Sequence, residues 1–228
     1  MQSKPEILLC GDTAISVEFG DKIDPGINAL VRRLYALLKS GSHPGIVDLN
    51  PTYRSLFVQY DPWVCSFERV VGIIEQCLPY IGTPAEEASA VKDVPVCYGG
   101  EFGPDLEEVA ALHGLGSDEV IGLHCAPLYQ VYMIGFTPGF AYLGGLDERL
   151  HTPRKKVPRK RVAAGSVGIA DRQTGIYPID SPGGWRLIGR TPRKIFDLER
   201  EHPFFLEAGD FVRFKPIAGE EFEKHFGS

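Results

Sequence analysis

The chain has 228 residues, of which 43% are hydrophobic and 24% are charged, and its formal net charge is −6 at pH 7. This composition is typical of a globular protein and argues against disorder, and the acidic balance argues against nucleic acid as a partner. No apolar run approaches the ~18 residues that a membrane-spanning helix needs, and the first residues lack the apolar core of a signal peptide. We therefore expect a cytoplasmic protein that has no membrane partner.

The cysteines and histidines predict neither disulfides nor a metal site. The number of cysteines is odd, none forms a Cys-x-x-Cys pair, and all lie in or beside apolar stretches, so we expect core thiols. They are Cys10, Cys65, Cys77, Cys97 and Cys125. The histidines are scattered, and none pairs with another at metal-ligand spacing.

Residues 1–85 are predicted to form a small α+β domain. Ile15, Val17 and Phe19 alternate with polar residues, which indicates a half-buried strand. The later elements are a helix at 27–38 closed by a left-handed Gly41, strands at 45–49 and 55–60, and a helix at 67–78 capped by Ser66. The order ββαββα favours an antiparallel sheet backed by two helices, an α+β sandwich.

Residues 91–228 are predicted to form a β-barrel domain, after a small, polar and pattern-free linker at 82–90. Two short helices are expected at 104–112 and 117–124. From residue 127 onward, short strands alternate with glycine and proline turns, which favours a closed barrel over a parallel sheet. The expected strands are 94–98, 128–134, 162–170, 174–179, 185–189 and 210–214.

The segment 135–192 is the candidate functional surface, because it holds ten glycines and six prolines. Glycine lets the backbone approach a ligand and proline fixes a loop, although barrel corners also need glycines. Phe136 and Phe140 flank a rigid turn at Pro138, which predicts a shaped apolar wall. A second tight turn presents Trp185, whose indole suits either a binding wall or the core.

Polar candidates in this segment are less specific. Gln173 both donates and accepts, which fits amide or carboxylate recognition as well as an ordinary surface position. His151 is a candidate acid–base group, and Arg186 and Arg190 could hold an anion. The six cations of residues 154–161 fit a solvated loop, an anionic ligand or an acidic protein partner. The sequence has no nucleophile elbow, Walker A loop or dinucleotide fingerprint, so catalytic residues stay unassigned.

Several long motifs together resemble the KipI family, which is also known as the B subunit of ATP-dependent 5-oxoprolinase and as allophanate hydrolase subunit 1. The motifs are GFTPGFAYLGGLD (135–147), AGSVGIA (164–170), QTGIYP (173–178), SPGGW (181–185), IGRTP (188–192) and GDFVRF (209–214). The resemblance extends over nearly the whole chain, since the ββαββα half is similar too. No amidase Ser-Ser-Lys site accompanies it, which speaks against the allophanate hydrolase name.

The resemblance implies a cyclophilin-like β-barrel after the small α+β domain, and an activity shared with other proteins of a complex. That activity is the cleavage of 5-oxoproline to glutamate with ATP, which this chain or a partner binds. The implied partners are the A subunit and the KipA-like C subunit of the same enzyme. Alternatives are a binding module that inhibits a sensor histidine kinase, and a subunit related to allophanate hydrolase or urea carboxylase.

On this interpretation one groove serves the substrate or a partner. Its expected wall consists of Phe136, Pro138, Phe140, Tyr177 and Trp185. The residues expected to orient a lactam or a carboxylate are Arg161, Ser166 and Gln173, and Arg190 belongs to the same groove.

Overall fold

The computed structural model describes residues 4–82 and 91–226. The chain divides into two compact units, Met1–Ala88 and Ser89–Ser228, each of which is described by itself. Most of the predicted linker, at 83–90, lies outside the described residues. Within the described ranges, no helix has the length and apolar character that crossing a membrane requires.

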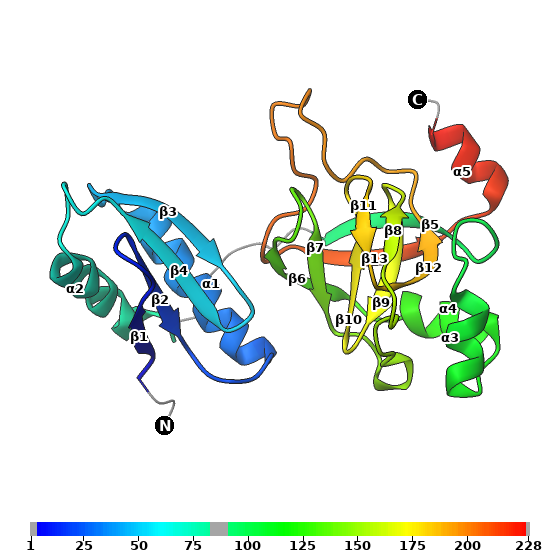
Figure 1. The fold of residues 1–228 in the computed structure, drawn as a ribbon, viewed down its shortest axis with the longest axis horizontal. Coiled ribbons are helices and arrows are strands. Elements are labelled where there is room, and N and C mark those ends of the chain that lie inside the picture. The colour runs from blue at the N-terminus through cyan, green and yellow to red at the C-terminus, as the bar shows by residue number, and fades with distance from the viewer. Residues whose placement is uncertain (1–3, 83–90, 227–228) are drawn as a thin grey trace. The chain divides into compact units, whose positions relative to one another are not determined.

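The first unit is an antiparallel sheet with two helices, and the predicted order ββαββα is confirmed (Figure 1). The strands are β1 (Glu6–Leu9), β2 (Ala14–Glu18), β3 (Ile46–Pro51) and β4 (Ser55–Tyr60), and the helices are α1 (Pro25–Ser40), α2 (Phe67–Cys77) and the 3-10 turn η1 (Leu78–Tyr80). The strand order is β1-β2-β4-β3.

Helix ends in this unit follow from their capping residues. Asp24 accepts hydrogen bonds from the backbone of Gly26 and Ile27, and the side chain of Ser66 accepts one from Arg69, as predicted for an N-cap. The expectation for Gly41 was wrong in one respect. It does end α1, but in an extended conformation with φ −84°, so no left-handed cap forms. Wholly buried Ile15, Leu34 and Ile74 belong to the core between sheet and helices.

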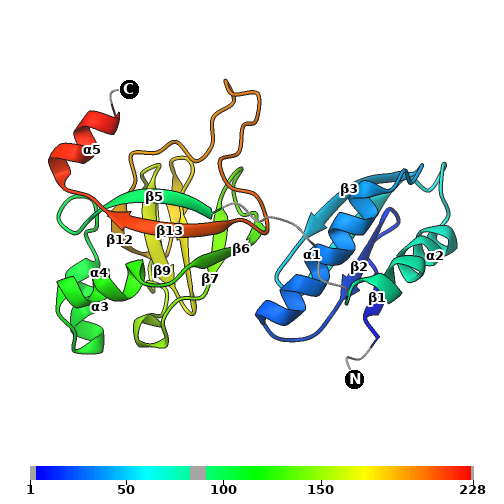
Figure 2. The same cartoon turned by 180° about the vertical axis from the view of Figure 1, so that it is seen from behind.

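The second unit is built on a closed barrel, which confirms the α+β class and the predicted barrel. Its strands follow the order β10-β7-β6-β13-β5-β12-β9, and β11 and β8 form a separate pair. The strand bounds are β5 (Val91–Tyr98), β6 (Tyr129–Ile134), β7 (Ala141–Gly144), β8 (Arg159–Val162), β9 (Ser166–Ala170), β10 (Gln173–Ile176), β11 (Ser181–Gly183), β12 (Arg186–Arg190) and β13 (Phe211–Pro216). Figure 2 shows β5 and β13 side by side, and they pair in parallel from Val91 with Phe211 onward.

Helices and a 3-10 turn accompany the barrel strands. They are α3 (Leu106–His113), α4 (Ser117–Cys125), η2 (Glu148–Leu150) and α5 (Gly219–Phe226). Gly114 ends α3 in the left-handed conformation at φ 65°. Val109 and Val120, one from each of α3 and α4, reach the same core as the barrel residues Val131 and Phe214. The segment between β12 and β13, orange in Figure 1, projects beyond the strands.

The prediction of one strand over 162–170 was wrong. The structure ends β8 at Val162 and begins β9 at Ser166, with a turn between them. Gly165 adopts φ 82° there, a left-handed backbone conformation that a continuous strand does not contain. Its N–H donates to the carbonyl of Tyr177 at 2.7 Å. β7 and β11 were not predicted, because each is short and is interrupted by glycine or proline.

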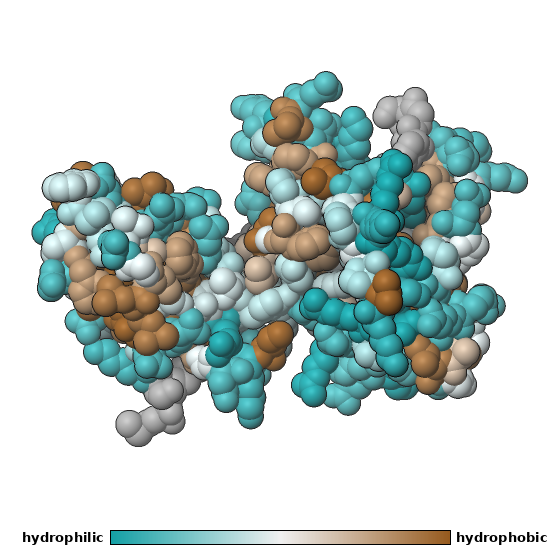
Figure 3. All heavy atoms as spheres, in the orientation of Figure 1, coloured by the Kyte–Doolittle hydropathy of each residue, from teal (hydrophilic) through white to brown (hydrophobic). Residues whose placement is uncertain are grey.

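The face drawn in Figure 3 is mostly polar, with separate apolar patches. Trp63, in the first unit, is 95% exposed, whereas Trp185 in the barrel unit is 5% exposed. All the cysteines are free thiols. Cys65 and Cys97 are buried, as expected for core cysteines, whereas Cys10, Cys77 and Cys125 are half-buried. The two tryptophans therefore report on different units and different environments.

Candidate functional site

Three aromatic side chains of the barrel unit, Tyr142, Tyr177 and Trp185, pack edge to face around Phe140. The centroid of its ring lies 4.8 Å from that of Tyr142, 5.0 Å from that of Tyr177 and 5.3 Å from that of Trp185. This geometry sets the positive edge of one ring against the negative face of the next. Phe140 and Tyr177 are each 1% exposed, so burial fixes these rings. We call the four residues the aromatic wall.

The aromatic wall lines a pocket of about 230 Å³. The lining residues are Phe136, Phe140, Tyr142, Arg154, Pro158, Tyr177, Pro182, Gly183, Gly184 and Trp185. This volume is below that of drug-sized sites, so the pocket suits a ligand of metabolite size. Most of its lining is apolar, and Arg154 is its one charged residue among those described.

The turn before Trp185 depends on glycine. A Cβ added at Gly183 would lie 2.4 Å from the hydroxyl oxygen of Tyr177, so any side chain there would displace the phenol. The Tyr177 hydroxyl accepts a hydrogen bond from the backbone of Trp185. Burial raises the pKa of Tyr177, and this hydrogen bond opposes the rise. The phenol thereby fixes the turn that presents the indole.

Phe136 forms the exposed lip of the pocket. Its ring lies 5.6 Å from that of Phe140, and the residue is 62% exposed. Its φ of 66° is in the left-handed region, which is uncommon for a bulky side chain. A strained turn thus holds an aromatic ring in solvent at the mouth of an aromatic pocket, an arrangement that often marks a functional site.

The structure brings together the predicted aromatic residues but not the predicted polar ones. Arg161 is bound to Asp180 at 2.6 Å, and the Nε of Arg190 donates to the carbonyl of Ala164 at 2.8 Å. The other predicted residues outside the pocket are Pro138, which is exposed, and Ser166 and Gln173, which are buried in β9 and β10. His151, which follows η2, does not line the pocket either.

The predicted site residues did not include Tyr142, Arg154 and Pro158, which line the pocket, whereas the turn at Pro182–Gly184 was predicted to present Trp185 and does line it. The motif around Tyr142 carried a signal, because this tyrosine follows Phe140 at the two-residue spacing that puts side chains on one face of a strand. The sequence gives no comparable signal for Arg154 and Pro158, because the pattern of the basic run does not indicate which of its residues line a pocket.

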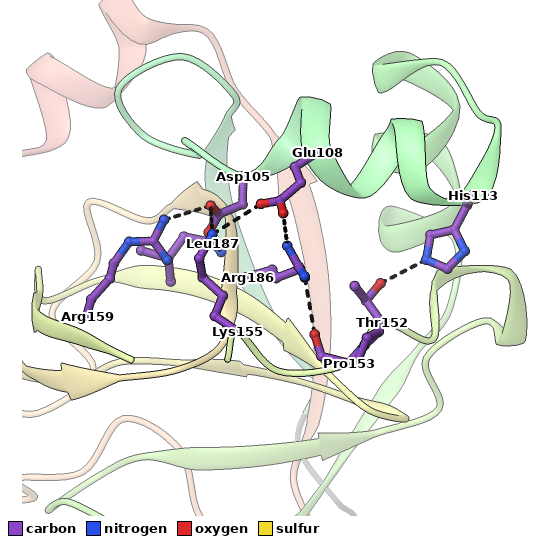
Figure 4. A network of polar contacts seen from close by, with 9 residues as sticks. All are labelled: Asp105, Glu108, His113, Thr152, Pro153, Lys155, Arg159, Arg186 and Leu187. Atoms are coloured by element: carbon purple, nitrogen blue, oxygen red, sulfur yellow. Dashed lines mark hydrogen bonds and ion pairs between the residues drawn. The ribbon is translucent and has the colours of Figure 1, made fainter. Parts of the chain in front are cut away.

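Two carboxylates at the start of α3 hold much of the basic run, and Figure 4 shows both pointing toward its cations. Asp105 accepts from Arg159 at 2.7 Å, from Lys155 at 3.0 Å and from the backbone N–H of Leu187 at 2.7 Å. Glu108 pairs with Lys155 at 3.1 Å and also with Arg186. We call these side chains the α3 network.

The α3 network binds two cations of the basic run, Lys155 and Arg159, within the barrel unit. Burial alone would raise the pKa of Asp105, but the hydrogen bonds from Arg159, Leu187 and Lys155 outweigh it, so the pKa lies below its usual value. Lys155 and Arg159 are thus committed to structural contacts within the unit. These contacts account for two of the six cations of residues 154–161, and the interpretation of the others as a site for an anionic ligand stays a prediction.

A second buried network lies beneath β10. The Nε2 of His124 is 2.9 Å from Thr174 Oγ1, and its Nδ1 is 2.8 Å from the hydroxyl of Tyr98. Thr174 Oγ1 donates to the carbonyl of Gly168 at 3.0 Å, so it accepts from Nε2–H. His124 is therefore neutral, with its proton on Nε2, and it fixes the strand that passes under the aromatic wall.

This arrangement predicts a pH dependence of stability. Burial lowers the pKa of His124 from 6.5 to about 3. Below pH 6.5, His124 is protonated in the unfolded chain but stays neutral in the folded chain. The free energy of unfolding should therefore fall by about 1.4 kcal/mol per pH unit as the pH drops toward 3. The contribution is complete above pH 6.5. Urea unfolding at several pH values should show a flatter slope for His124→Gln, and an unchanged slope would contradict this assignment.

No group of histidine, cysteine and acidic residues within the described ranges could hold a metal ion. A second hollow, of about 260 Å³, lies in the first unit between α1 and β3, where Tyr35, His43 and Leu49 are among its lining residues. It lacks the buried aromatic cluster and the strained lip of the barrel pocket. The barrel pocket is therefore the better candidate site.

Comparisons with known proteins identify close relatives. Residues 5–206 match the family described as carboxyltransferase domain, subdomains C and D. The chain is 41% identical to the 5-oxoprolinase B subunit of Bacillus subtilis over 235 residues, which cover 99% of this chain and 98% of that protein. It also matches the crystal structure of TTHA0988 with a TM-score of 0.81 and 40% identity, over 90% of this chain.

Two further similarities concern longer proteins. The chain spans only 40% of the TTHA0988 chain. Urea amidolyase of Saccharomyces cerevisiae is 24% identical over 94% of this chain, a match that covers 13% of the enzyme. The same fold therefore occurs within larger polypeptides that carry other parts.

Proposed function

Since this chain belongs to the family of the 5-oxoprolinase B subunit, we propose that it is one component of an ATP-dependent 5-oxoprolinase. In this role it acts with the A and C subunits to open 5-oxoproline to glutamate in the cytoplasm. The observation that carries the proposal is the 41% identity to the Bacillus subtilis protein over nearly the whole of both chains. The distant match to urea amidolyase gives weaker support to a carboxylase-related role.

The pocket defines what this chain contributes. A five-membered lactam is compact enough for about 230 Å³, and it combines one polar amide with three ring carbons that an apolar surface can cover. The aromatic wall can hold its ring and exclude water, which strengthens the polar contacts made at the lactam group. The sequence has no Walker A loop, so we assign ATP binding to a partner protein of the complex or to a site shared with one.

The chemistry explains the need for ATP. An amide carbon is a poor electrophile, and phosphoryl transfer from ATP to the lactam oxygen activates it. Water then adds to this carbon, the ring C–N bond breaks and the nitrogen takes a proton, which leaves an open-chain acyl phosphate. A second water hydrolyses this acyl phosphate to the carboxylate of glutamate and inorganic phosphate. Holding the ring in one orientation through these steps lowers the entropic part of the barrier, and this is the task we assign to the aromatic wall.

Reconstitution tests the proposal. The chain is expressed with its sister subunits, and glutamate and phosphate are measured with and without 5-oxoproline. We expect both products in equal amounts, and only when every component of the complex is present. If a preparation without this chain cleaves 5-oxoproline at the same rate, the proposed role is wrong.

The binding-module alternative stays a prediction, because no known contact with a kinase bears on it. This alternative requires the pocket to bind a segment of a folded protein and not a small molecule. Binding of the full chain to the histidine-phosphotransfer domain of a sensor kinase, measured in a pull-down, would support it.

A further inference from the structure

The mouth of the aromatic pocket carries one cation. Of the described residues that line the pocket, only Arg154 is charged. Three cations of the same run have acidic partners, since Lys155 and Arg159 bind Asp105 and Arg161 binds Asp180. The run's other cations, Lys156 and Lys160, do not line the pocket. An anionic group that entered this pocket would therefore meet the guanidinium of Arg154.

The backbone on both sides of Arg154 is fixed. Thr152 is wholly buried and exchanges two backbone hydrogen bonds with Asp171, at 2.7 and 3.2 Å. Its hydroxyl lies 2.9 Å from Nε2 of His113 (Figure 4). On the other side, the N–H of Lys155 donates to the carbonyl of Gly184 at 2.8 Å. The chain thus presents Arg154 from a rigid base, although its side chain is 59% exposed.

The present partner of Arg154 is weakly held. Its Nε donates to Oδ2 of Asp171 at 3.2 Å, and the two side chains are 59% and 60% exposed. Exposed ion pairs of this kind contribute little, because water competes for both charges. Within the described part of the chain this is the one hydrogen bond of the Arg154 side chain, so both terminal amino groups are available. A carboxylate can accept from two guanidinium N–H groups at once.

The charge of Arg154 also reaches the interior of the pocket. Burial raises the pKa of Tyr142 and of Tyr177, and in both cases the positive charge of Arg154 opposes the rise. The guanidinium therefore lies near the phenols of the aromatic wall. Apolar rings on one side and a single cation at the mouth together define a site for a small cyclic molecule with one negative charge.

We propose that Arg154 is the carboxylate anchor of this pocket, and that Asp171 is an exchangeable counter-ion that the carboxylate of the ligand displaces. The ligand class is a five-membered cyclic amide bearing a carboxylate, and this assignment rests on the proposed function. The ring lies against the aromatic wall while the carboxylate binds the terminal amino groups of Arg154. A lactam without the carboxylate can contact the aromatic wall but cannot bind Arg154.

Trp185 supplies the readout. The sequence has two tryptophans, and the Trp63→Phe variant leaves only the indole of the aromatic wall. Titration of this full-length variant with 5-oxoproline should change the Trp185 fluorescence in a saturable way. The neutral lactam 2-pyrrolidinone should bind about tenfold more weakly or worse, because charge-assisted hydrogen bonds to its missing carboxylate are lost.

Two substitutions in this background should act in opposite directions. Arg154→Gln should raise the Kd of 5-oxoproline about tenfold or more, to the value of the neutral lactam. Asp171→Asn should lower the Kd severalfold, because it frees Arg154. Asparagine tolerates the φ of 52° at this position, so the turn is kept. The matched control is Arg149→Gln, which removes an exposed arginine paired with Asp147 and should change nothing.

Three results would overturn the proposal: no saturable signal in the Trp63→Phe chain, equal affinity for the neutral lactam, or equal Kd values for Arg154→Gln and Arg149→Gln. The outcome is separable from that of the proposed function. If the complex with Arg154→Gln still cleaves 5-oxoproline with an unchanged KM, the role of Arg154 as anchor is contradicted and the proposed function is supported. Conversely, if the chain binds 5-oxoproline as described but the complex does not cleave it, the carboxylate anchor is supported and the proposed function is contradicted.

Discussion

Replacing Asp105 with alanine should lower the free energy of unfolding of the barrel unit by about 3 kcal/mol, because Arg159 and the buried N–H of Leu187 lose their acceptor and Lys155 keeps only Glu108. The Asp105 side chain is 4% exposed, whereas Lys155 and Arg159 are 25% and 26% exposed, so water recovers part of the loss. In a unit of this size the change corresponds to a fall in Tm of about 8 °C. Denaturant unfolding followed by Trp185 fluorescence in the Trp63→Phe background measures it.

Asp105→Asn and a surface control make this prediction specific. The asparagine keeps an acceptor for the Leu187 N–H but loses the charge, so its cost should be smaller. Asp93→Ala removes the exposed pair with Arg213, whose side chains are 50% and 49% exposed, and should cost less than about 1 kcal/mol. If Asp105→Ala and Asp93→Ala proved equally mild, the α3 network would not hold the barrel unit together.

The elements that the sequence predicted well are those in which local pattern and burial agree. The helix of α1 has a capping Asp24 and a regular apolar face, and the structure confirms it. Trp185 and Phe140 were predicted as a wall because turn residues and aromatics coincide, and the rings do meet. Short β11 has no such pattern, because Pro182 and Gly183 occupy a strand that pairs only with β8. Its existence depends on contacts between distant residues.

The polar half of the site could not be predicted for a related reason. Several arginines and lysines follow one another in the basic run, and the positions of Asp105 and Asp180 decide which become structural. Those carboxylates come from other parts of the chain, so spacing within the run says nothing about them. Gln173 was weighed against an ordinary surface position, which its burial in β10 excludes, and its role in binding stays a prediction.

Phe136→Ala should reduce the kcat/KM of the complex for 5-oxoproline about tenfold or more, with little change in stability. The ring covers the mouth of the pocket and contacts Phe140, so its loss opens the bound ring to water. Because Phe136 is 62% exposed, the folded chain loses little burial, and Tm should change only slightly. Leu198→Ala is the matched control, since this leucine is 77% exposed and does not line the pocket.

The kcat/KM for ATP-dependent glutamate formation, compared between complexes that carry Phe136→Ala and Leu198→Ala, tests most directly whether the aromatic pocket of this chain is part of the 5-oxoprolinase site. We expect the first complex to fall about tenfold or more below the second, at equal Tm. Equal kcat/KM values for the two complexes would show that 5-oxoproline is bound elsewhere.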